Sequence, residues 1–142
     1  MKYVSKFPHK IIEYADMPII MSDGCRLSAR VWMPEDANNN QYPAILEHLP
    51  YRKRDGTIVR DQYTHPWLAG HGYVCIRTDM RGNGDSDGLM TDEYTHQEHQ
   101  DAIEVMVLFK NKILSVDYLP ISEGTYYLTG NSLSENIYLP IL

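Results

Sequence analysis

The sequence predicts an α/β domain built on a mixed, mostly parallel sheet. Three observations predict this class. An Asp-Gly turn joins two β-rich runs near the N-terminus, a helical segment lies between two short apolar runs, and a capped amphipathic helix follows. An antiparallel hairpin followed by β-α-β-α-β is the order that results. In such sheets the chemistry lies at the carboxyl ends of the parallel strands.

The first two expected strands form a hairpin. Residues 11–21 are rich in β-formers and lead into Asp23-Gly24, a pair that favours a tight type I′ turn because such a turn needs a positive φ. The return strand, residues 25–33, alternates apolar residues with Arg, Ser and Trp. This alternation indicates one buried face and one partly exposed face.

A βαβ unit is expected next. The apolar run 43–46 predicts a short central strand, and residues 73–78 predict the following one. Between them lie a polar loop and a helix expected over residues 62–69, with Pro66 in its first turn. Strands joined in this way run parallel through a right-handed crossover.

A second helix and a last strand complete the expected sheet. Thr95 and Glu98 have the spacing of a capping box, and the helix that they begin runs to about Lys110. Its apolar stripe consists of Ala102, Val105, Met106 and Phe109. A strand is expected over residues 125–129. We expect that strand to be parallel as well, so that the loops 49–61, 79–88 and 130–134 share one sheet edge.

Composition narrows the classes of function. The formal net charge is −6 and the pI about 5.4, so the balance gives no sign of nucleic-acid binding. No run approaches the roughly 18 apolar residues of a membrane span. The two cysteines form neither a disulfide framework nor a zinc spacing. We expect a soluble cytoplasmic protein without a cofactor or a metal.

Two loops contain candidates for nucleophilic chemistry. Gly130-Asn131-Ser132-Leu133-Ser134 follows the last expected strand and resembles the G-x-S-x-G nucleophile elbow, with Ser134 in place of the second glycine. An ordinary Ser/Asn loop is the alternative. Tyr51 lies after the 43–46 strand, where its hydroxyl can donate to a developing oxyanion. An ordinary loop tyrosine is the alternative there.

Other polar clusters indicate structure rather than chemistry. The Gly- and Asp-rich loop 79–88 has no lysine for a phosphate loop and lacks the calcium-loop spacing, so it is interpreted as a structural turn. His96 and His99 do not form the H-E-x-x-H pattern and are expected on a solvated helix face. His65 and His71 have no partner that the sequence identifies.

Five segments together resemble the N-terminal part of the X-Pro dipeptidyl-peptidase and cocaine-esterase family of α/β-hydrolases. They are M-P-I-I-M-S-D-G-C-R-L (17–27), L-P-Y-R-K (49–53), H-P-W-L-A-G-H-G-Y (65–73), D-M-R-G-N-G-D-S-D-G (79–88) and D-A (101–102). The resemblance implies a partial α/β-hydrolase fold over residues 1–112 and a serine hydrolase of esters or amides, including X-Pro peptides. It implies Ser132 as the nucleophile, with the Tyr51 hydroxyl and the Leu133 amide as the oxyanion hole.

The tail, residues 113–142, departs from that family and contains no Lys or Arg. In this fold the catalytic acid and histidine follow the nucleophile, whereas Glu135 is the one carboxylate after Ser132 and no histidine follows it. We therefore expect a truncated hydrolase that is inactive alone and either self-associates or needs a complementing chain. A non-enzymatic interaction module and an unrelated α/β domain that binds small molecules are the alternatives.

Overall fold

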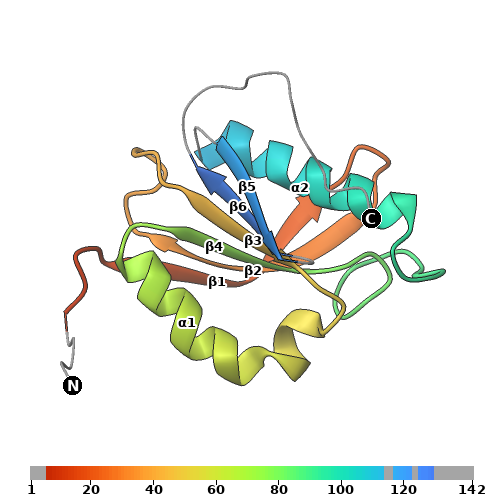
Figure 1. Ribbon diagram of the computed structural model, residues 1–142, viewed down its shortest axis with the longest axis horizontal. Coiled ribbons are helices and arrows are strands. Elements are labelled where there is room, and N and C mark those ends of the chain that lie inside the picture. The colour runs from red at the N-terminus through yellow and green to blue at the C-terminus, as the bar shows by residue number, and fades with distance from the viewer. Residues whose placement is uncertain (1–5, 114–116, 123–124, 130–142) are drawn as a thin grey trace.

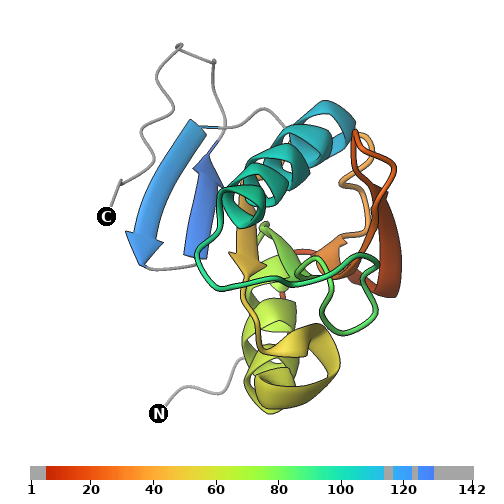
Figure 2. The ribbon, with the colours of Figure 1, turned by 90° about the vertical axis from the view of Figure 1, so that its right-hand side faces the viewer.

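The computed structural model describes residues 6–113, 117–122 and 125–129, in which a mixed sheet lies between two helices, α1 and α2 (Figures 1 and 2). The sheet has six strands in the order β1-β2-β4-β3-β6-β5. Their bounds are Ile11–Ile20 (β1), Arg26–Pro34 (β2), Ala44–His48 (β3), Val74–Asp79 (β4), Asp117–Ser122 (β5) and Thr125–Thr129 (β6). The helices are Ile58–Gly70 (α1) and His96–Ile113 (α2), and a π-helical turn, η1, covers Arg52–Gly56.

The predicted hairpin is confirmed, but its turn differs. β1 and β2 pair antiparallel. The Gly24 amide donates to the Met21 carbonyl at 2.9 Å, and Gly24 has φ +83° whereas Asp23 has no positive φ. The expected type I′ turn is therefore wrong, because that turn needs positive φ at both central residues. Instead the Asp23 carboxylate accepts the Cys25 amide at 2.9 Å, and the connection is a three-residue loop that ends in a left-handed glycine.

The βαβ unit is confirmed, with a longer helix than expected. β3 and β4 pair parallel from Ala44↔Val74 to His48↔Thr78. α1 begins at Ile58, so Pro66 lies inside the helix rather than in its first turn. The earlier start has a local cause: the Asp61 amide donates to the Thr57 carbonyl at 2.9 Å, and the Thr57 hydroxyl donates to the Asp61 carboxylate at 2.8 Å.

A Schellman motif ends α1 and directs the chain into β4. The Tyr73 amide donates to the Leu68 carbonyl at 3.2 Å and the Gly72 amide to the Ala69 carbonyl at 3.1 Å, with Gly72 at φ +91°. At the start of α2 the Glu98 amide donates to the Thr95 hydroxyl at 3.2 Å, as the capping box predicts. The Glu98 carboxylate reaches one residue further back than expected, to the Tyr94 amide at 2.9 Å.

The last expected strand exists, but the parallel direction predicted for it is wrong. β6 pairs antiparallel with β3, with Leu128 opposite Ala44. β5, which the sequence did not predict, pairs antiparallel with β6 at the sheet edge, where a proline such as Pro120 is tolerated. α2 returns the chain so that β5 runs in the direction of β3 and β4, and the short connection after Ser122 reverses it into β6. Among the described strands, parallel pairing is therefore confined to β3 and β4.

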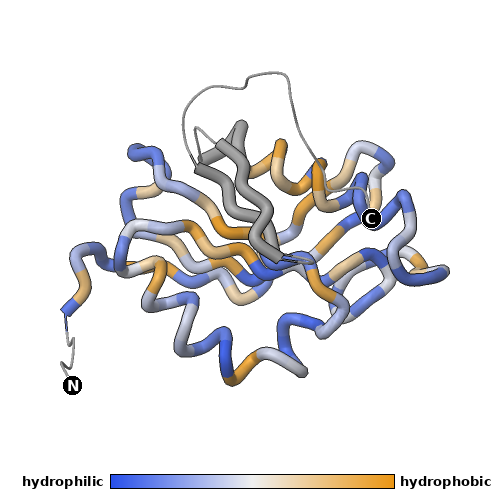
Figure 3. The backbone as a smooth tube through the Cα atoms, viewed as in Figure 1, coloured by the Kyte–Doolittle hydropathy of each residue, from blue (hydrophilic) through white to orange (hydrophobic). Residues whose placement is uncertain are grey.

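Apolar side chains fill both faces of the sheet, and Figure 3 shows hydrophobic residues concentrated along the central strands and along α2. Under α2 the stripe predicted from the sequence is buried against strand residues such as Leu27, Leu46 and Ile76. On the α1 side a smaller cluster consists of Trp32, Ile45, Ala69 and Cys75. Neither of the two described helices is long and apolar enough to cross a membrane.

Candidate functional site

Two loops meet where the parallel strands end. The loop after β3 contains Tyr51, whose side chain is 57% exposed and whose carbonyl accepts the Gly56 amide at 3.1 Å. The next residue, Arg52, has φ 55°, a left-handed conformation that costs a non-glycine residue about 1–3 kcal/mol. Such strain persists only where neighbouring contacts hold the backbone in that conformation. Here the contacts of Lys53 do so.

Lys53 fastens the Tyr51 loop to the end of β4. Its side chain is fully buried. Its backbone amide donates to Oδ1 of Asp79 at 2.5 Å, and its Nζ donates to Oδ2 of Asp79 at 3.1 Å and to Asp85 at 2.5 Å. A buried ammonium requires compensating charge, so the loop and the strand end are locked together.

A third carboxylate approaches the same ammonium from the edge strand. β1 carries a bulge between Tyr14 and Met17, and Asp16 within it lies 3.8 Å from Lys53 Nζ. The hydrogen bond from the Ser28 hydroxyl lowers the pKa of Asp16, and the positive charge of Lys53 lowers it further. The hydrogen bond from Lys53 likewise lowers the pKa of Asp85. Asp16 and Asp85 are therefore negative near neutral pH.

The glycines of the loop after β4 allow its backbone to wrap around Asp79. Gly84 has φ +55°, and a Cβ there would lie 2.2 Å from the Asp79 carboxylate. The Asp85 amide donates to that carboxylate at 2.8 Å. Asn83 donates to the Pro50 carbonyl at 2.8 Å, which fixes the backbone just before Tyr51. The loop is the structural turn that the sequence predicts, and it supports the Tyr51 loop.

Arg81 joins this loop to α2 and to the hairpin. Its Nε and Nη2 donate to the two oxygens of Asp101 at 2.8 Å each, and its Nη1 lies 2.9 Å from Asp23. The Asp101 hydrogen bond raises the pKa of Arg81. Two parallel bonds of this kind are rigid as well as strong, so α2 is held in place relative to the sheet edge.

On the opposite face, Glu47, Asp61 and His65 present ligand atoms within 4.8 Å of one another, as a metal site would. Two guanidinium groups already hold these carboxylates. Arg77 lies 3.3 Å from Glu47 and 3.6 Å from Asp61, and Arg60 lies 2.9 Å from Asp61 and also pairs with Glu47. A divalent cation would be repelled by both, so we interpret the group as an ion-pair network.

The structure supplies partners for the histidines that the sequence left unassigned. His65 is buried and stacks on Trp32 at 4.8 Å between ring centroids, and burial lowers its pKa. His71 Nδ1 lies 2.7 Å from the Trp67 carbonyl. His96 and His99 are exposed, as expected of a solvated face.

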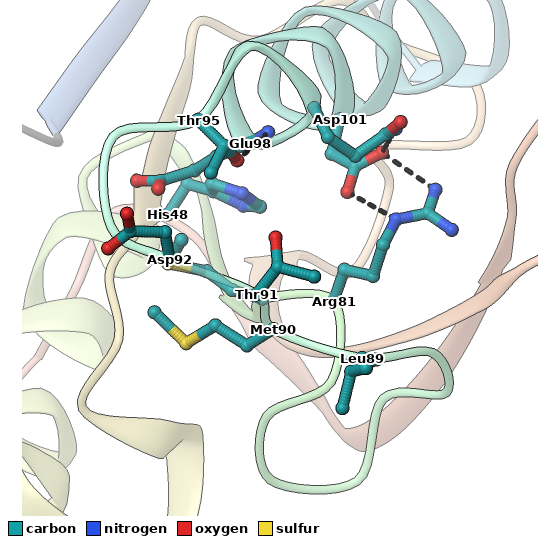
Figure 4. Close-up of a pocket in the computed structure, with 11 residues that line it drawn as sticks. His48, Arg81, Leu89, Met90, Thr91, Asp92, Thr95, Glu98 and Asp101 are labelled. Atoms are coloured by element: carbon teal, nitrogen blue, oxygen red, sulfur yellow. Dashed lines mark hydrogen bonds and ion pairs between the residues drawn. The ribbon is translucent and has the colours of Figure 1, made fainter.

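His48, which the sequence analysis did not single out, ends β3 on the α2 side of the sheet. Its Nδ1 lies 2.7 Å from the Thr78 hydroxyl, and its Nε2 has no hydrogen-bond partner. Burial lowers the pKa of His48 to about 4. It lines a cavity of about 280 Å³ beside Arg81 and Asp101 (Figure 4). Two polar residues, Glu47 and His48, at the end of an apolar run were the only sequence signal for it.

Of the predicted site residues, Tyr51 lies at the carboxyl end of β3. Ser132 and Leu133 lie outside the described residues. The sequence placed them on the same edge as Tyr51 because it assumed a parallel last strand. That assumption is wrong: the carboxyl end of β6 lies beside the amino end of β3. Of the three predicted site residues, the structure therefore describes Tyr51 alone.

Acid should destabilise the fold through His48. Its pKa is about 4 when folded and about 6.5 when unfolded. Between pH 6.5 and pH 4 the folded state binds fewer protons than the unfolded state. The stability that the neutral His48 ring contributes is therefore complete above pH 6.5 and is lost as the pH falls towards 4. We expect a loss of about 3 kcal/mol, at about 1.36 kcal/mol per pKa unit.

Urea unfolding followed by circular dichroism at several pH values measures this loss. The variant His48→Gln cannot titrate at this position and should show a shallower dependence between pH 6.5 and 4. Equal slopes for the two proteins would contradict the assignment to His48.

Comparisons with known proteins extend this description. A family model described as X-Pro dipeptidyl-peptidase (S15 family) matches residues 23–113. A solved CocE/NonD family hydrolase from Staphylococcus aureus has a TM-score of 0.59 at 19% identity, over 74% of this chain and 21% of that one. A solved alpha-amino acid ester hydrolase has a TM-score of 0.48 at 19% identity, over 78% and 20%. No curated protein matches the chain significantly.

The chain thus spans about a fifth of the length of the solved hydrolases that it matches. The similarity to the Staphylococcus aureus hydrolase is one of fold, and it confirms a partial α/β-hydrolase architecture.

Proposed function

Because the chain belongs to the X-Pro dipeptidyl-peptidase (S15) family, we propose that it is part of a serine hydrolase that cleaves esters or peptide amides through an acyl-enzyme. The observation that carries the proposal is the family match over residues 23–113. It includes both loops that meet at the ends of β3 and β4.

The rigid Tyr51 loop supports this proposal. Hydrogen bonds fix the backbone on both sides of Tyr51, through Asn83 to Pro50 and through Lys53 to Asp79, while the side chain stays exposed. Stabilisation of an oxyanion depends on donors that need no reorganisation when charge develops. A fixed backbone beneath an accessible hydroxyl meets that need.

In the proposed reaction, the Ser132 hydroxyl attacks the carbonyl carbon while a histidine takes its proton, and the carbonyl oxygen becomes an oxyanion. The Tyr51 hydroxyl and the Leu133 amide donate to that oxygen. The histidine then protonates the leaving alcohol or amine, and water releases the acid from Ser132. No histidine follows Ser132 in these 142 residues. In this proposal another polypeptide segment therefore supplies the histidine and the catalytic carboxylate that orients it. Because β6 in this chain ends beside the amino end of β3, the proposal also requires residues 125–129 to pair parallel with β3 once the supplied segment is bound.

The 142-residue chain alone should therefore hydrolyse p-nitrophenyl acetate no faster than buffer. Turnover that disappears in Ser132→Ala would contradict the need for a supplied base. The second arm mixes the chain with a fragment of the Staphylococcus aureus hydrolase that begins after the position corresponding to Ser134, so that Ser132 is the one candidate nucleophile in the mixture. We expect turnover from the mixture that Ser132→Ala abolishes.

Tyr51→Phe tests the oxyanion hole in the same mixture. Loss of one donor lowers kcat by about 10²–10³. Tyr94→Phe removes the hydroxyl of a tyrosine that is 71% exposed and lies outside the proposed hole. As the control, it should keep kcat within about threefold. Similar losses in the two variants would contradict the role of Tyr51.

A second proposal is an interaction module, and the outer face of α1 favours it. Val59, Tyr63 and Trp67 are 67%, 76% and 48% exposed and recur every fourth residue along the helix. Exposed apolar patches mark association sites. We expect the chain to self-associate through this face, or to bind a complementing hydrolase segment there.

Sedimentation velocity at several concentrations tests the association. The wild type should shift to larger species as concentration rises, and Tyr63→Lys should reduce that shift. A monomer at every concentration that also binds no complementing fragment would overturn this second proposal.

We also propose a cytoplasmic location with no nucleic-acid or membrane partner. Both cysteines are free, as is usual in reducing compartments, and the net charge of −6 disfavours polyanions.

A further inference from the structure

The cavity above His48 has a polar atom at its floor that nothing in the described structure satisfies. The His48 side chain is 4% exposed, and its Nε2 has no hydrogen-bond partner. Figure 4 shows the ring pointing into the space enclosed by Thr91, Asp101 and Arg81. Buried polar atoms without partners are uncommon, so an occupant of the cavity is the natural partner.

The hydrogen bonds around Thr78 determine what that partner offers. The Thr78 hydroxyl lies 2.7 Å from His48 Nδ1 and 3.5 Å from the Glu47 carbonyl. Both contacts are hydrogen bonds in one arrangement: Nδ1–H donates to Thr78, and Thr78 donates to the carbonyl. Since burial lowers the pKa of His48 to about 4, the ring is neutral at pH 7 and Nε2 is left as an acceptor.

The charge around the cavity favours a cation. Asp92, Glu98 and Asp101 line it together with one guanidinium, that of Arg81. The charge of Arg81 is already paired with the carboxylates of Asp101 and Asp23. Asp92 and Glu98 each accept one backbone amide, at 2.8 and 2.9 Å, and neither has a cationic partner among the described residues. The cavity therefore has an excess of negative charge.

We propose that this cavity binds the ammonium group of a small primary amine. Nε2 of His48 accepts one N–H of the amine, and the carboxylates of Asp92 and Glu98 compensate its charge. The side chains of Met80 and Leu89 line the cavity and provide contact for its carbon chain. A volume of about 280 Å³ lies at the small end of ligand sites. The proposal involves none of the residues assigned to hydrolysis.

Other occupants fit less well. An anion would face Asp92 and Glu98, and a quaternary ammonium has no N–H for Nε2. A metal ion needs ligand atoms within a few ångströms of one another. Among the described residues the group that meets this is Glu47, Asp61 and His65, on the other face of the sheet.

Nitrogen-15 NMR of the histidine rings tests the proposal on the chain itself. Butylammonium chloride should shift the Nε2 resonance of His48 saturably. Butanol, of similar size but uncharged, should not, and tetramethylammonium should bind at least about tenfold more weakly. In the free protein the same spectra should show Nε2 without a proton. Equal shifts from butanol or from sodium chloride at the same ionic strength, or a protonated Nε2, would overturn the proposal.

Charge-neutralising variants locate the site. Asp92→Asn and Glu98→Gln should each weaken butylammonium binding at least about tenfold, since a hydrogen bond to a charged group has an energy of that size. Glu98→Gln keeps an acceptor for the Tyr94 amide, so the helix cap survives. Glu93→Gln removes a neighbouring exposed carboxylate that does not line the cavity, and it should leave affinity unchanged. An equal effect in Glu93→Gln would show nonspecific charge attraction and overturn the assignment.

Discussion

Lys53→Met should lower the free energy of unfolding by about 3–5 kcal/mol. Lys53 is fully buried and its Nζ pairs with Asp79, which is itself 1% exposed. Removal of one partner of a buried ion pair costs this much because the other charge is left uncompensated in the interior. Methionine keeps most of the side-chain volume, so the loss reports the charge rather than a cavity. Urea unfolding followed by circular dichroism measures it.

Arg54→Met is the matched control. Arg54 is adjacent in sequence and also pairs with Asp85, at 3.0 Å, but its side chain is 61% exposed. Exposed ion pairs contribute about 0–1 kcal/mol, so this change should be nearly neutral. The double variant Lys53→Met with Asp79→Asn removes the buried charge and should recover at least about 1 kcal/mol of the loss. If Lys53→Met costs no more than Arg54→Met, the buried pair does not stabilise the loop.

Gly82→Ala should also cost about 3–5 kcal/mol. Gly82 has φ +70°, and a Cβ there would lie 2.2 Å from the Met90 amide nitrogen. The clash is with backbone, which cannot rotate away as a flexible side chain can. Strain at a left-handed residue costs about 1–3 kcal/mol, and overpacking adds about 1–3 kcal/mol.

Gly24→Ala separates these two causes. Gly24 also has a positive φ, +83°, but its added Cβ would meet nothing within 4 Å. It should therefore show the conformational cost alone, about 1–2 kcal/mol. Equal losses for the two variants would mean that the contact with Met90 is relieved by movement of the loop.

The elements that the sequence predicted correctly are those defined by local patterns. The β1–β2 hairpin, the β3–α1–β4 unit and the stripe of α2 each follow from periodicity or from a capping residue within a few positions. The start of α1 was predicted too late because Thr57 and Asp61 are polar residues of the kind that loops contain. Only the structure shows that they bond to each other and that Asp61 is buried beside Arg77.

The larger errors concern pairing at a distance. Nothing within residues 125–129 states whether the strand runs with β3 or against it. The direction of β6 depends on β5, the strand that precedes it. The sequence analysis did not predict β5, which contains Pro120. In the candidate site, too, local features were predicted and contacts between distant residues were not. Tyr51 was identified from a motif and from its place after a strand, whereas the acceptor of Lys53 lies 26 residues away in the sequence. Such partners become visible only when both loops are placed.

The burial of Trp32 has a spectroscopic consequence. The chain has two tryptophans. Trp32 is inaccessible to solvent and stacked on His65, whereas Trp67 is 48% exposed and lies against His71 at 4.2 Å between centroids. Trp32 should emit at short wavelength, resist quenching by iodide, and shift to the red only when the sheet itself comes apart. Trp67 should be quenched by iodide in the folded state. Single Trp→Phe variants thus provide one optical probe of the core and another of the α1 surface.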